Sequence, residues 1–247
     1  MRVVAIVQAR MGSTRLPGKV LMDAGGETVL SRVIARLSRA KRIDEIVIAT
    51  TKLSADDAIV KEARRKKIES FRGSEQDVLD RYCQAAAVYC ADIVVRITAD
   101  CPLIDSSVVD DVIEACLTNQ ADLACNELPR SFPRGLDTEV FTTAALLRAD
   151  EIAKQPYQRE HVTPVFYERQ DMFHLFSVSA ERDYSQHRWT LDTAEDLELI
   201  RAIYSHFDNK NDFGWRDSIA LMERLPYLAT INAHVVQKPV CDSATVH

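Results

Sequence analysis

The first half of the chain alternates short apolar runs with segments that carry apolar residues at helical spacing. The apolar runs are rich in β-branched residues, which is typical of strands buried on both faces, and they lie at residues 2–8, 43–50, 92–98 and 121–126. The segments with helical spacing lie between them, at residues 29–41, 56–67, 75–90 and 106–118. Strands that alternate with helices form parallel sheets with right-handed crossovers. The pattern therefore predicts an α/β fold with a mostly parallel central sheet.

The pattern is less regular after residue 127. Three residues that interrupt regular structure, Pro129, Pro133 and Gly135, indicate a loop. Strands are expected at residues 137–142, 173–179 and 188–191, and helices at residues 143–154, 158–168, 193–204 and 215–225. Residues 235–247 lack periodicity and are expected to form a tail or an oligomer contact. We predict a single domain over residues 1–234, with residues 127–185 as an excursion from the sheet.

Length and composition predict a globular domain without a membrane or nucleic-acid partner. The chain has 247 residues, of which 47% are hydrophobic and 28% are charged. The formal net charge of −6 argues against general nucleic-acid binding, which needs a basic surface. No apolar run reaches the length of about 18 residues that indicates a membrane span. The six cysteines form no C-x-x-C pair, so we expect free thiols in a reducing, cytoplasmic compartment.

A loop with three cations follows the first predicted strand. Residues 3–22 contain no acidic residue, although acidic residues are in excess in the chain as a whole. Arg10, Arg15 and Lys19 can form charge-assisted hydrogen bonds with phosphate, and Gly12 lets the backbone approach phosphate oxygens. Because ligands bind at the carboxyl edge of open α/β sheets, the loop predicts a polyphosphate or anion site. The alternative is a mobile surface loop with incidental cations.

Two aspartates are expected at the same edge of the sheet. Asp100 follows the strand predicted at residues 92–98, and Pro102 prevents that strand from continuing. Asp192 follows the short strand expected at residues 188–191. Two such carboxylates suit Mg²⁺, which takes few protein ligands besides phosphate oxygens and water. The alternatives are a turn aspartate for Asp100 and a helix N-cap for Asp192.

Five separated segments carry motifs of one known enzyme family. They are residues 9–19 (ARMGSTRLPGK), 72–82 (RGSEQDVLDRY), 134–141 (RGLDTEVF), 159–164 (REHVTP) and 192–197 (DTAEDL). Together they resemble the CMP-sugar synthetases, a family of cytidylyltransferases that includes the 3-deoxy-manno-octulosonate and acylneuraminate enzymes. The second and fourth segments are similar to the branch of the spore-coat polysaccharide biosynthesis protein F. The resemblance spans residues 3–200, with the motifs in the family's order.

This resemblance implies a three-layer fold of the nucleotide-diphospho-sugar transferase type and a single nucleotidyltransferase domain. It implies CTP as co-substrate and Mg²⁺ as cofactor. CMP would be transferred to an acidic small-molecule acceptor, with release of pyrophosphate, for surface polysaccharide or glycan biosynthesis. Similar proteins are commonly homodimers, so residues 127–185 are expected to bind the acceptor and to contact a second subunit.

The resemblance also implies roles for individual residues. Asp100 and Asp192 would hold Mg²⁺, and together with Arg15 and Lys19 they are the expected catalytic residues. The positions expected to bind the nucleotide are Ala9, Arg10, Gly12, Ser13, Arg15, Lys19, Thr50, Arg72 and Ser74. Thr50, Arg72 and Ser74 would contact the cytosine.

An acidic acceptor requires cations around it. Three side chains could pair with its carboxylate or phosphate: Arg134, Arg159 and His161. Asp137 and Glu139 alternate on an expected strand and would bind acceptor hydroxyls from one face. The alternatives are a solvated helix face for Arg159, a packed core histidine for His161, and ion pairs with arginines for both acids.

Departures from the family pattern leave the identity of the acceptor open. Gln8 replaces a proline, and Cys101 stands where the octulosonate enzymes have glutamate. Asp192 stands alone where the sialic-acid enzymes carry a D-x-D pair. One competing function is a glycosyltransferase on the same fold, although the D-x-D motif that would mark it is absent after the third predicted strand. The other is a nucleotide-binding module without catalysis.

Overall fold

The computed structural model describes residues 1–237, which contain a seven-stranded sheet. Its strands are β1 (Val3–Gln8), β2 (Glu45–Thr51), β3 (Glu69–Gly73), β4 (Ile93–Thr98), β5 (Leu123–Cys125), β6 (Glu139–Thr142) and β7 (Leu175–Ser177). They lie in the order β3-β2-β1-β4-β6-β5-β7. β6 runs antiparallel to both of its neighbours, and every other pairing in the sheet is parallel. The mostly parallel sheet predicted from the sequence is confirmed.

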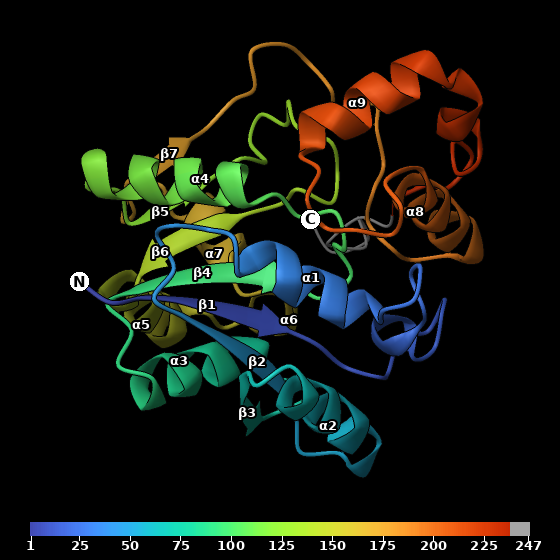
Figure 1. The fold of residues 1–247 in the computed structure, drawn as a ribbon. Coiled ribbons are helices and arrows are strands. Elements are labelled where there is room, and N and C mark those ends of the chain that lie inside the picture. The colour runs from blue at the N-terminus through green and yellow to red at the C-terminus, as the bar shows by residue number, and fades with distance from the viewer. Residues whose placement is uncertain (238–247) are drawn as a thin grey trace.

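Helices cover both faces of this sheet (Figure 1). The α-helices are α1 (Val29–Leu37), α2 (Asp57–Arg65), α3 (Val78–Val88), α4 (Ser106–Thr118), α5 (Thr143–Ile152), α6 (Pro156–His161), α7 (Pro164–Glu168), α8 (Ala194–His206) and α9 (Trp215–Arg224), and the 3₁₀ helices are η1 (Lys19–Leu21), η2 (Ser54–Asp56) and η3 (Pro226–Thr230). Successive residues of β1 point to opposite faces. Ala5 and Val7 pack in a core with α1, α2 and α4, whereas Val4 and Ile6 pack in a core with α3, α5 and α7. The expected three-layer sandwich is confirmed.

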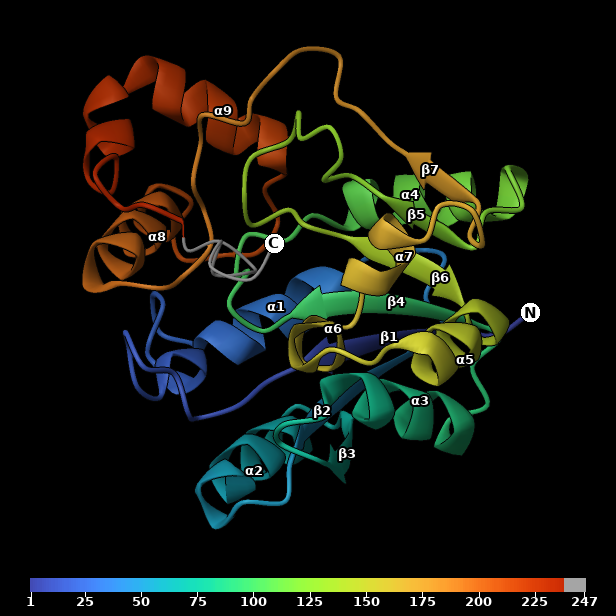
Figure 2. The same ribbon diagram turned by 180° about the vertical axis from the view of Figure 1, so that it is seen from behind.

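A third hydrophobic cluster lies beyond the end of the sheet toward which β1 and β4 point, around α8 and α9 (Figures 1 and 2). Trp189 is fully buried there, and it shares the cluster with Tyr204 of α8 and Trp215 of α9. The Tyr204 hydroxyl donates a hydrogen bond to the carbonyl oxygen of Pro102 at 2.7 Å. This cluster holds the C-terminal part of the chain against the carboxyl edge of the parallel strands.

The loop between β5 and β6, residues 126–138, begins and ends at this same edge because β6 is antiparallel. Arg134 in this loop forms an isolated parallel bridge with Arg188. Gly135 has a φ of +106°, and a Cβ added there would lie 2.6 Å from the carbonyl carbon of Trp189. Only glycine permits both this conformation and this approach, so the two segments pack backbone against backbone.

Three elements differ from those predicted. The strand expected at residues 188–191 is not formed, and this segment makes only the bridge at Arg188. The helix expected at residues 158–168 is divided into α6 and α7, because Val162 has a φ of +71° and Pro164, the first residue of α7, has no N–H to donate into a continuing helix. β3 was not predicted, because its sequence ESFRG lacks an apolar run.

Several expectations fall partly or wholly outside what the structure tests. Of the expected tail at residues 235–247, residues 238–247, which include Cys241, lie outside the described part of the chain. The five cysteines of the described part are free thiols. Within that part, no helix is both long and apolar enough to cross a membrane. The domain limits and the dimer contact expected for residues 127–185 stay predictions.

Candidate active site

The cationic loop leaves β1 at the carboxyl edge of the sheet and folds back on itself. The backbone N–H of Met11 donates to Asp56 Oδ1 at 2.8 Å, and the N–H of Gly18 donates to the carbonyl oxygen of Met11 at 3.1 Å. Gly18 has a φ of +70°, which glycine adopts without strain. This turn starts η1 and places Lys19 at its first residue.

The Lys19 ammonium joins the two aspartates predicted from the sequence. Nζ lies 2.6 Å from Asp100 Oδ2 and 2.9 Å from Asp192 Oδ1, and it also donates to the carbonyl oxygen of Leu191 at 2.7 Å. The N–H of Leu191 donates to the carbonyl oxygen of Asp100 at 2.8 Å. The structure therefore brings Asp100 and Asp192 together, through side chains and through backbone, although Asp192 does not follow a strand.

Three cations surround Asp192. Besides Lys19, the Arg15 guanidinium lies 2.9 Å from Oδ1 and the Arg188 guanidinium lies 2.7 Å from Oδ2. Burial alone would raise the pKa of Asp192, but these cations outweigh it and hold the pKa below its ordinary value. Burial alone would lower the pKa of Lys19, but the carboxylates of Asp100 and Asp192 outweigh it and raise that pKa. Both groups are therefore charged at neutral pH.

The loop after β1, the acidic pair and part of the β5–β6 loop line one cavity of about 520 Å³. This volume lies within the range of small-molecule and cofactor sites. The sequence-predicted residues on its wall are Ala9, Arg10, Gly12, Ser13, Arg15, Lys19, Asp100, Arg134, Asp137, His161 and Asp192. The triphosphate, metal and acceptor candidates thus share a single cavity.

Arg134 lines this cavity, and its guanidinium lacks a carboxylate partner among the described residues. Among the described residues, no ion pair involves the Arg134 guanidinium, whereas the neighbouring Asp137 pairs with Arg130. His161 lines the cavity as well, and burial lowers its pKa, so its ring is neutral at pH 7. Asp137 does not share a strand face with Glu139 as expected, because β6 begins only at Glu139.

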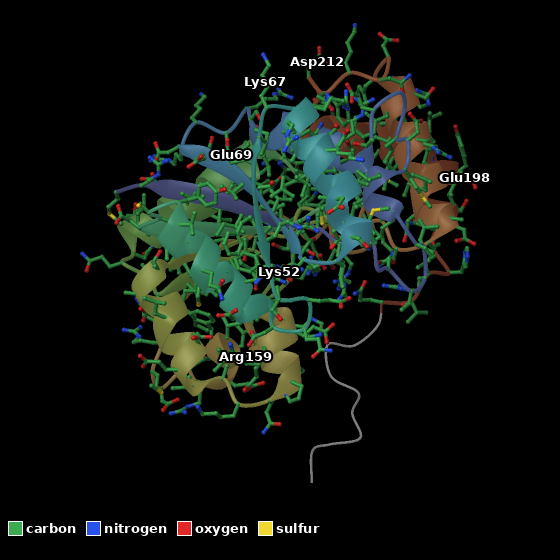
Figure 3. All side chains as sticks on the ribbon, turned by 90° about the horizontal axis from the view of Figure 1, so that it is seen from below. Lys52, Lys67, Glu69, Arg159, Glu198 and Asp212 are labelled. Carbon is green, nitrogen blue, oxygen red and sulfur yellow. The ribbon has the colours of Figure 1, made fainter. Side chains whose placement is uncertain are left out.

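Two acceptor candidates lie away from the cavity wall. Arg159 of α6 donates to Asp77 at 2.8 Å and to Asp150 of α5 at 2.7 Å, and Figure 3 shows it among these helices. Glu139 is 3% exposed and forms an ion pair with Arg96. The ion pair of Glu139 with an arginine corresponds to the structural alternative considered for it. Arg159 is held by two carboxylates and is not the solvated helix face considered as its alternative.

The cytosine candidates do not line the cavity either. Thr50 is fully buried in β2. Arg72 forms an ion pair with Asp57 at 2.6 Å, and the Ser74 hydroxyl accepts a hydrogen bond from the N–H of Asp77 at 3.0 Å. Their proposed contact with a nucleobase therefore requires a rearrangement that the structure does not contain.

Two arginines on the cavity wall were not predicted, the buried Arg81 of α3 and the partly buried Arg96 of β4. The Nε atoms of both have no hydrogen-bond partner within the described part of the chain. Arg96 interrupts the apolar run IVVRIT, and a charged residue in a buried strand is a usable signal for a functional or paired group. Arg81 lies in a helical pattern that gives no such signal.

Cys101 also lies on the cavity wall, but it is not suited to act as a nucleophile. Burial and the adjacent Asp100 raise the pKa of its thiol well above the ordinary value. The sulfur lies 3.3 Å from Thr98 Oγ1. The thiol is therefore protonated at neutral pH, and the cavity offers charge and hydrogen bonds rather than a thiolate.

The acidic pair fits a hard divalent cation. The facing oxygens of Asp100 and Asp192 already hold one cation, the Lys19 ammonium, between them. Carboxylate oxygens are preferred Mg²⁺ ligands, and this ion completes its shell with phosphate oxygens and water. Within residues 1–237, no cluster of three or more acidic, histidine or cysteine side chains could hold a metal. This donor set suits a metal that is shared with a bound phosphate.

Comparisons with known proteins agree with this arrangement. A family model described as "Cytidylyltransferase" matches residues 4–217. The spore coat polysaccharide biosynthesis protein SpsF of Bacillus subtilis is 32% identical over 235 residues, which are 92% of this chain and 97% of that protein. The 3-deoxy-manno-octulosonate cytidylyltransferase of Geobacter sulfurreducens is 33% identical over 123 residues, which are 49% of this chain and 48% of that protein. A solved structure of a cytidylyltransferase from Leptospira borgpetersenii has a TM-score of 0.90 and 39% identity, covering 93% of this chain and 97% of its own.

Proposed function

Since the chain belongs to the cytidylyltransferase family, we propose that it transfers CMP from CTP to an acidic sugar and releases pyrophosphate. Family membership confirms the resemblance seen in the sequence and makes the chain a CTP-dependent nucleotidyltransferase. The proposal adds Mg²⁺ as cofactor, an acidic acceptor, and a product used for surface polysaccharide. Relatives named for spore-coat polysaccharide biosynthesis and for 3-deoxy-manno-octulosonate support these additions.

The observation that carries the proposal is the convergence of opposite charges on one cavity. Arg10, Arg15 and Lys19 come from the loop after β1, whereas Asp100 and Asp192 come from segments far apart in the sequence. A triphosphate with a divalent cation needs both kinds of group within a few ångströms. The position of Lys19 between the two acids supports this convergence.

The chemical difficulty of the reaction is charge. A bond forms between an acceptor oxygen and the anionic α-phosphorus while the bond to pyrophosphate breaks, so negative charge accumulates on the leaving group. Arg10 and Arg15 would bind the phosphates, and Arg15 and Lys19 would stabilise the leaving pyrophosphate. When held by Asp100 and Asp192, Mg²⁺ supplies neutralisation of the α-phosphate and a lower pKa for the acceptor hydroxyl.

Nucleotide binding requires an exchange of ion pairs. In the free site, Arg15 and Lys19 both contact Asp192 Oδ1. Phosphate oxygens would take over these two cations, which leaves Asp100 without the Lys19 ammonium and Asp192 with Arg188 alone unless a divalent cation replaces them. Because an uncompensated buried carboxylate is costly, we expect nucleotide and metal to bind together.

The acceptor is proposed to be an anion that pairs with Arg134. Burial and the neighbouring Arg130 lower the pKa of Arg134, and among the described residues no ion pair involves its guanidinium, so this cation would be available to an acidic acceptor. A guanidinium can bind a carboxylate through two parallel hydrogen bonds.

We also propose a cytoplasmic homodimer with residues 127–185 at its interface. Light scattering would test whether the protein is a dimer.

The proposal is tested by pyrophosphate release with CTP, Mg²⁺ and a panel of acidic sugars and their neutral counterparts. We expect release with CTP and an acidic sugar, formation of the CMP-sugar by mass spectrometry, and at least about 10²-fold slower turnover for Asp100→Asn. Turnover of Asp100→Asn within about threefold of the parent would remove the metal assignment. Absence of release across the panel would point to a glycosyltransferase, and CTP binding without turnover would point to a binding module.

A further inference from the structure

The segment that follows α9 reaches back to the acidic pair. We propose that Asn232, which lies beyond the residues matched by the family model, is a positioning residue for Asp192 and acts through Arg188 and Asp196. This inference rests on the metal-binding role proposed for Asp192.

Arg188 links two buried carboxylates. Its Nη2 donates to Asp192 Oδ2 at 2.7 Å, and its Nε donates to Asp196 Oδ1 at 3.0 Å. The three side chains are 11%, 10% and 0% exposed, so little water can replace a lost partner. Arg188 therefore occupies one oxygen of Asp192 and leaves Oδ1 directed at Lys19 and Arg15.

Asp196 holds the backbone of the same segment. Its Oδ2 accepts hydrogen bonds from the N–H of Asp192 at 2.9 Å and from the N–H of Thr193 at 3.0 Å. The second of these belongs to the capping box of α8, in which Thr193 is the N-cap. Asp196 thus orients Asp192 twice, through the main chain and through Arg188.

Asn232 forms hydrogen bonds with both residues that orient Asp192, namely Arg188 and Asp196. Its Nδ2 donates to Asp196 Oδ1 at 2.8 Å and to the carbonyl oxygen of Arg188 at 2.9 Å, which uses both hydrogens of the amide. The residue is 4% exposed. Gln237, five residues further on, accepts from Arg188 Nη1 at 2.6 Å and lines the cavity. The C-terminal segment is thereby part of the wall behind Asp192.

The expected consequence concerns the affinity for metal rather than the fold alone. Removing a group that orients a metal ligand typically costs roughly 10–100-fold in metal affinity or activity. Without Asn232, Asp196 and the Arg188 backbone each lose a hydrogen bond, so the two residues that orient Asp192 are held less firmly. A purely structural role for Asn232 would lower stability without changing metal affinity.

The test is Mn²⁺ binding to the full chain in the presence of a non-hydrolysable CTP analogue, measured by isothermal titration calorimetry. We expect Asn232→Ala to weaken Mn²⁺ binding about tenfold and to raise the metal concentration for half-maximal pyrophosphate release by a similar factor.

Two variants of the same segment serve as controls. Leu228→Ala removes a fully buried side chain of the third hydrophobic cluster and should lower the melting temperature without changing Mn²⁺ affinity. His234→Ala alters an exposed residue and should change neither the melting temperature nor the Mn²⁺ affinity.

If Asn232→Ala is destabilised but binds Mn²⁺ within about twofold of the parent, this inference is overturned. If Asn232→Ala does not fold, Asn232→Ser is judged by the same criterion. A parent that binds neither Mn²⁺ nor the analogue would overturn the proposed function, and this inference with it.

Discussion

The Lys19 ammonium lies between the carboxylates of Asp100 and Asp192, and only 9% of the residue is exposed. Without the Lys19 ammonium, Asp100 would lose this cation and face the Asp192 carboxylate, and like charges repel. The residue therefore has two separable effects. It balances the acidic pair in the free protein, and in the proposed reaction it stabilises the leaving pyrophosphate.

Lys19→Ala should separate these two effects. We expect turnover to fall by about 10²-fold, because one charge-assisted contact to the leaving group is lost. Mn²⁺ binding to the nucleotide-free protein should become tighter, because the acidic pair loses its internal cation. Pyrophosphate release and calorimetry measure the two effects, with the exposed Lys210 as a control in Lys210→Ala. Unchanged metal affinity in Lys19→Ala would contradict this account.

At the scale of single residues, the sequence predicts a functional role where a residue stands out from its immediate neighbours. Lys19 lies in a loop without acidic residues, and Asp100 directly follows an apolar run. Arg188 and Asn232 give no such signal, because their importance comes from contacts with each other across 44 positions. Arg159 matched a family motif, yet its donors are satisfied by Asp77 and Asp150, which only the packing of α6 reveals.

At the scale of elements, Glu62 joins two helices that cover the same face of the sheet. This residue of α2 accepts hydrogen bonds from Thr28, the N-cap of α1, at 2.6 Å and from Ser31 at 2.5 Å. The hydrogen-bonded Arg65 is the largest influence that lowers the pKa of Glu62, and despite partial burial the pKa falls to about 2. The ionised carboxylate is thus stabilised in the folded state.

Glu62→Gln should destabilise the protein in a pH-dependent way. Because the folded-state pKa lies below the ordinary value of 4.5, the contribution is fully present above pH 4.5 and is lost as pH falls toward 2. We expect the free energy of unfolding to drop by about 1–3 kcal/mol at pH 7, with a smaller difference at pH 3. Urea unfolding at several pH values measures this. Glu198→Gln, at an exposed position of α8 (Figure 3), should show no such difference.

Periodicity predicts those elements whose apolar pattern is complete. The helix at Ser106–Thr118 was predicted with its exact limits, because Asp105 caps it and its apolar face is regular. β3 lies at the edge of the sheet and pairs only with β2, so few of its positions need to be apolar. The break at Val162 depends on a backbone conformation that apolar spacing does not reveal.

At the scale of the whole molecule, the active site depends on the docking of the C-terminal part against the sheet. Trp189, three residues before Asp192, anchors this part in the third hydrophobic cluster. The backbone contact of Gly135 with Trp189 joins the β5–β6 loop to the same segment. The position of Asp192 therefore depends on packing between segments that are distant in sequence.

Gly135→Ala should disturb this docking. The added Cβ would meet the Trp189 carbonyl carbon at 2.6 Å and the Thr190 nitrogen at 2.7 Å, so the two segments must separate. We expect a loss of about 2–4 kcal/mol in stability, together with reduced turnover, because Asp192 moves with the segment. Gly26→Ala has a similar backbone strain, with a φ of +89°, but its Cβ meets nothing within 4 Å. Thermal unfolding of both variants separates the cost of the clash with Trp189 from the cost of backbone strain. Equal losses of stability in the two variants would contradict this explanation.

At this scale, the sequence predicts the sheet and many residues of the cavity wall, but not the long-range contacts that complete the cavity. Alternation of apolar runs and helical segments is enough to indicate a parallel arrangement of the first strands. The reversal of β6 and the return of residues 231–237 to the acidic pair arise from long-range packing, which local patterns do not encode.

The antiparallel direction of β6 also bears on how such a protein can diversify. Because residues 126–138 depart from and return to one rim of the sheet, the loop can lengthen or shorten without shifting the register of any strand. The loop carries Arg134 and Asp137, whereas the cations proposed to bind phosphate belong to a separate segment. If Arg134 and Asp137 bind the acceptor as proposed, a change in the β5–β6 loop would alter acceptor preference and leave the proposed nucleotide-binding segment in place.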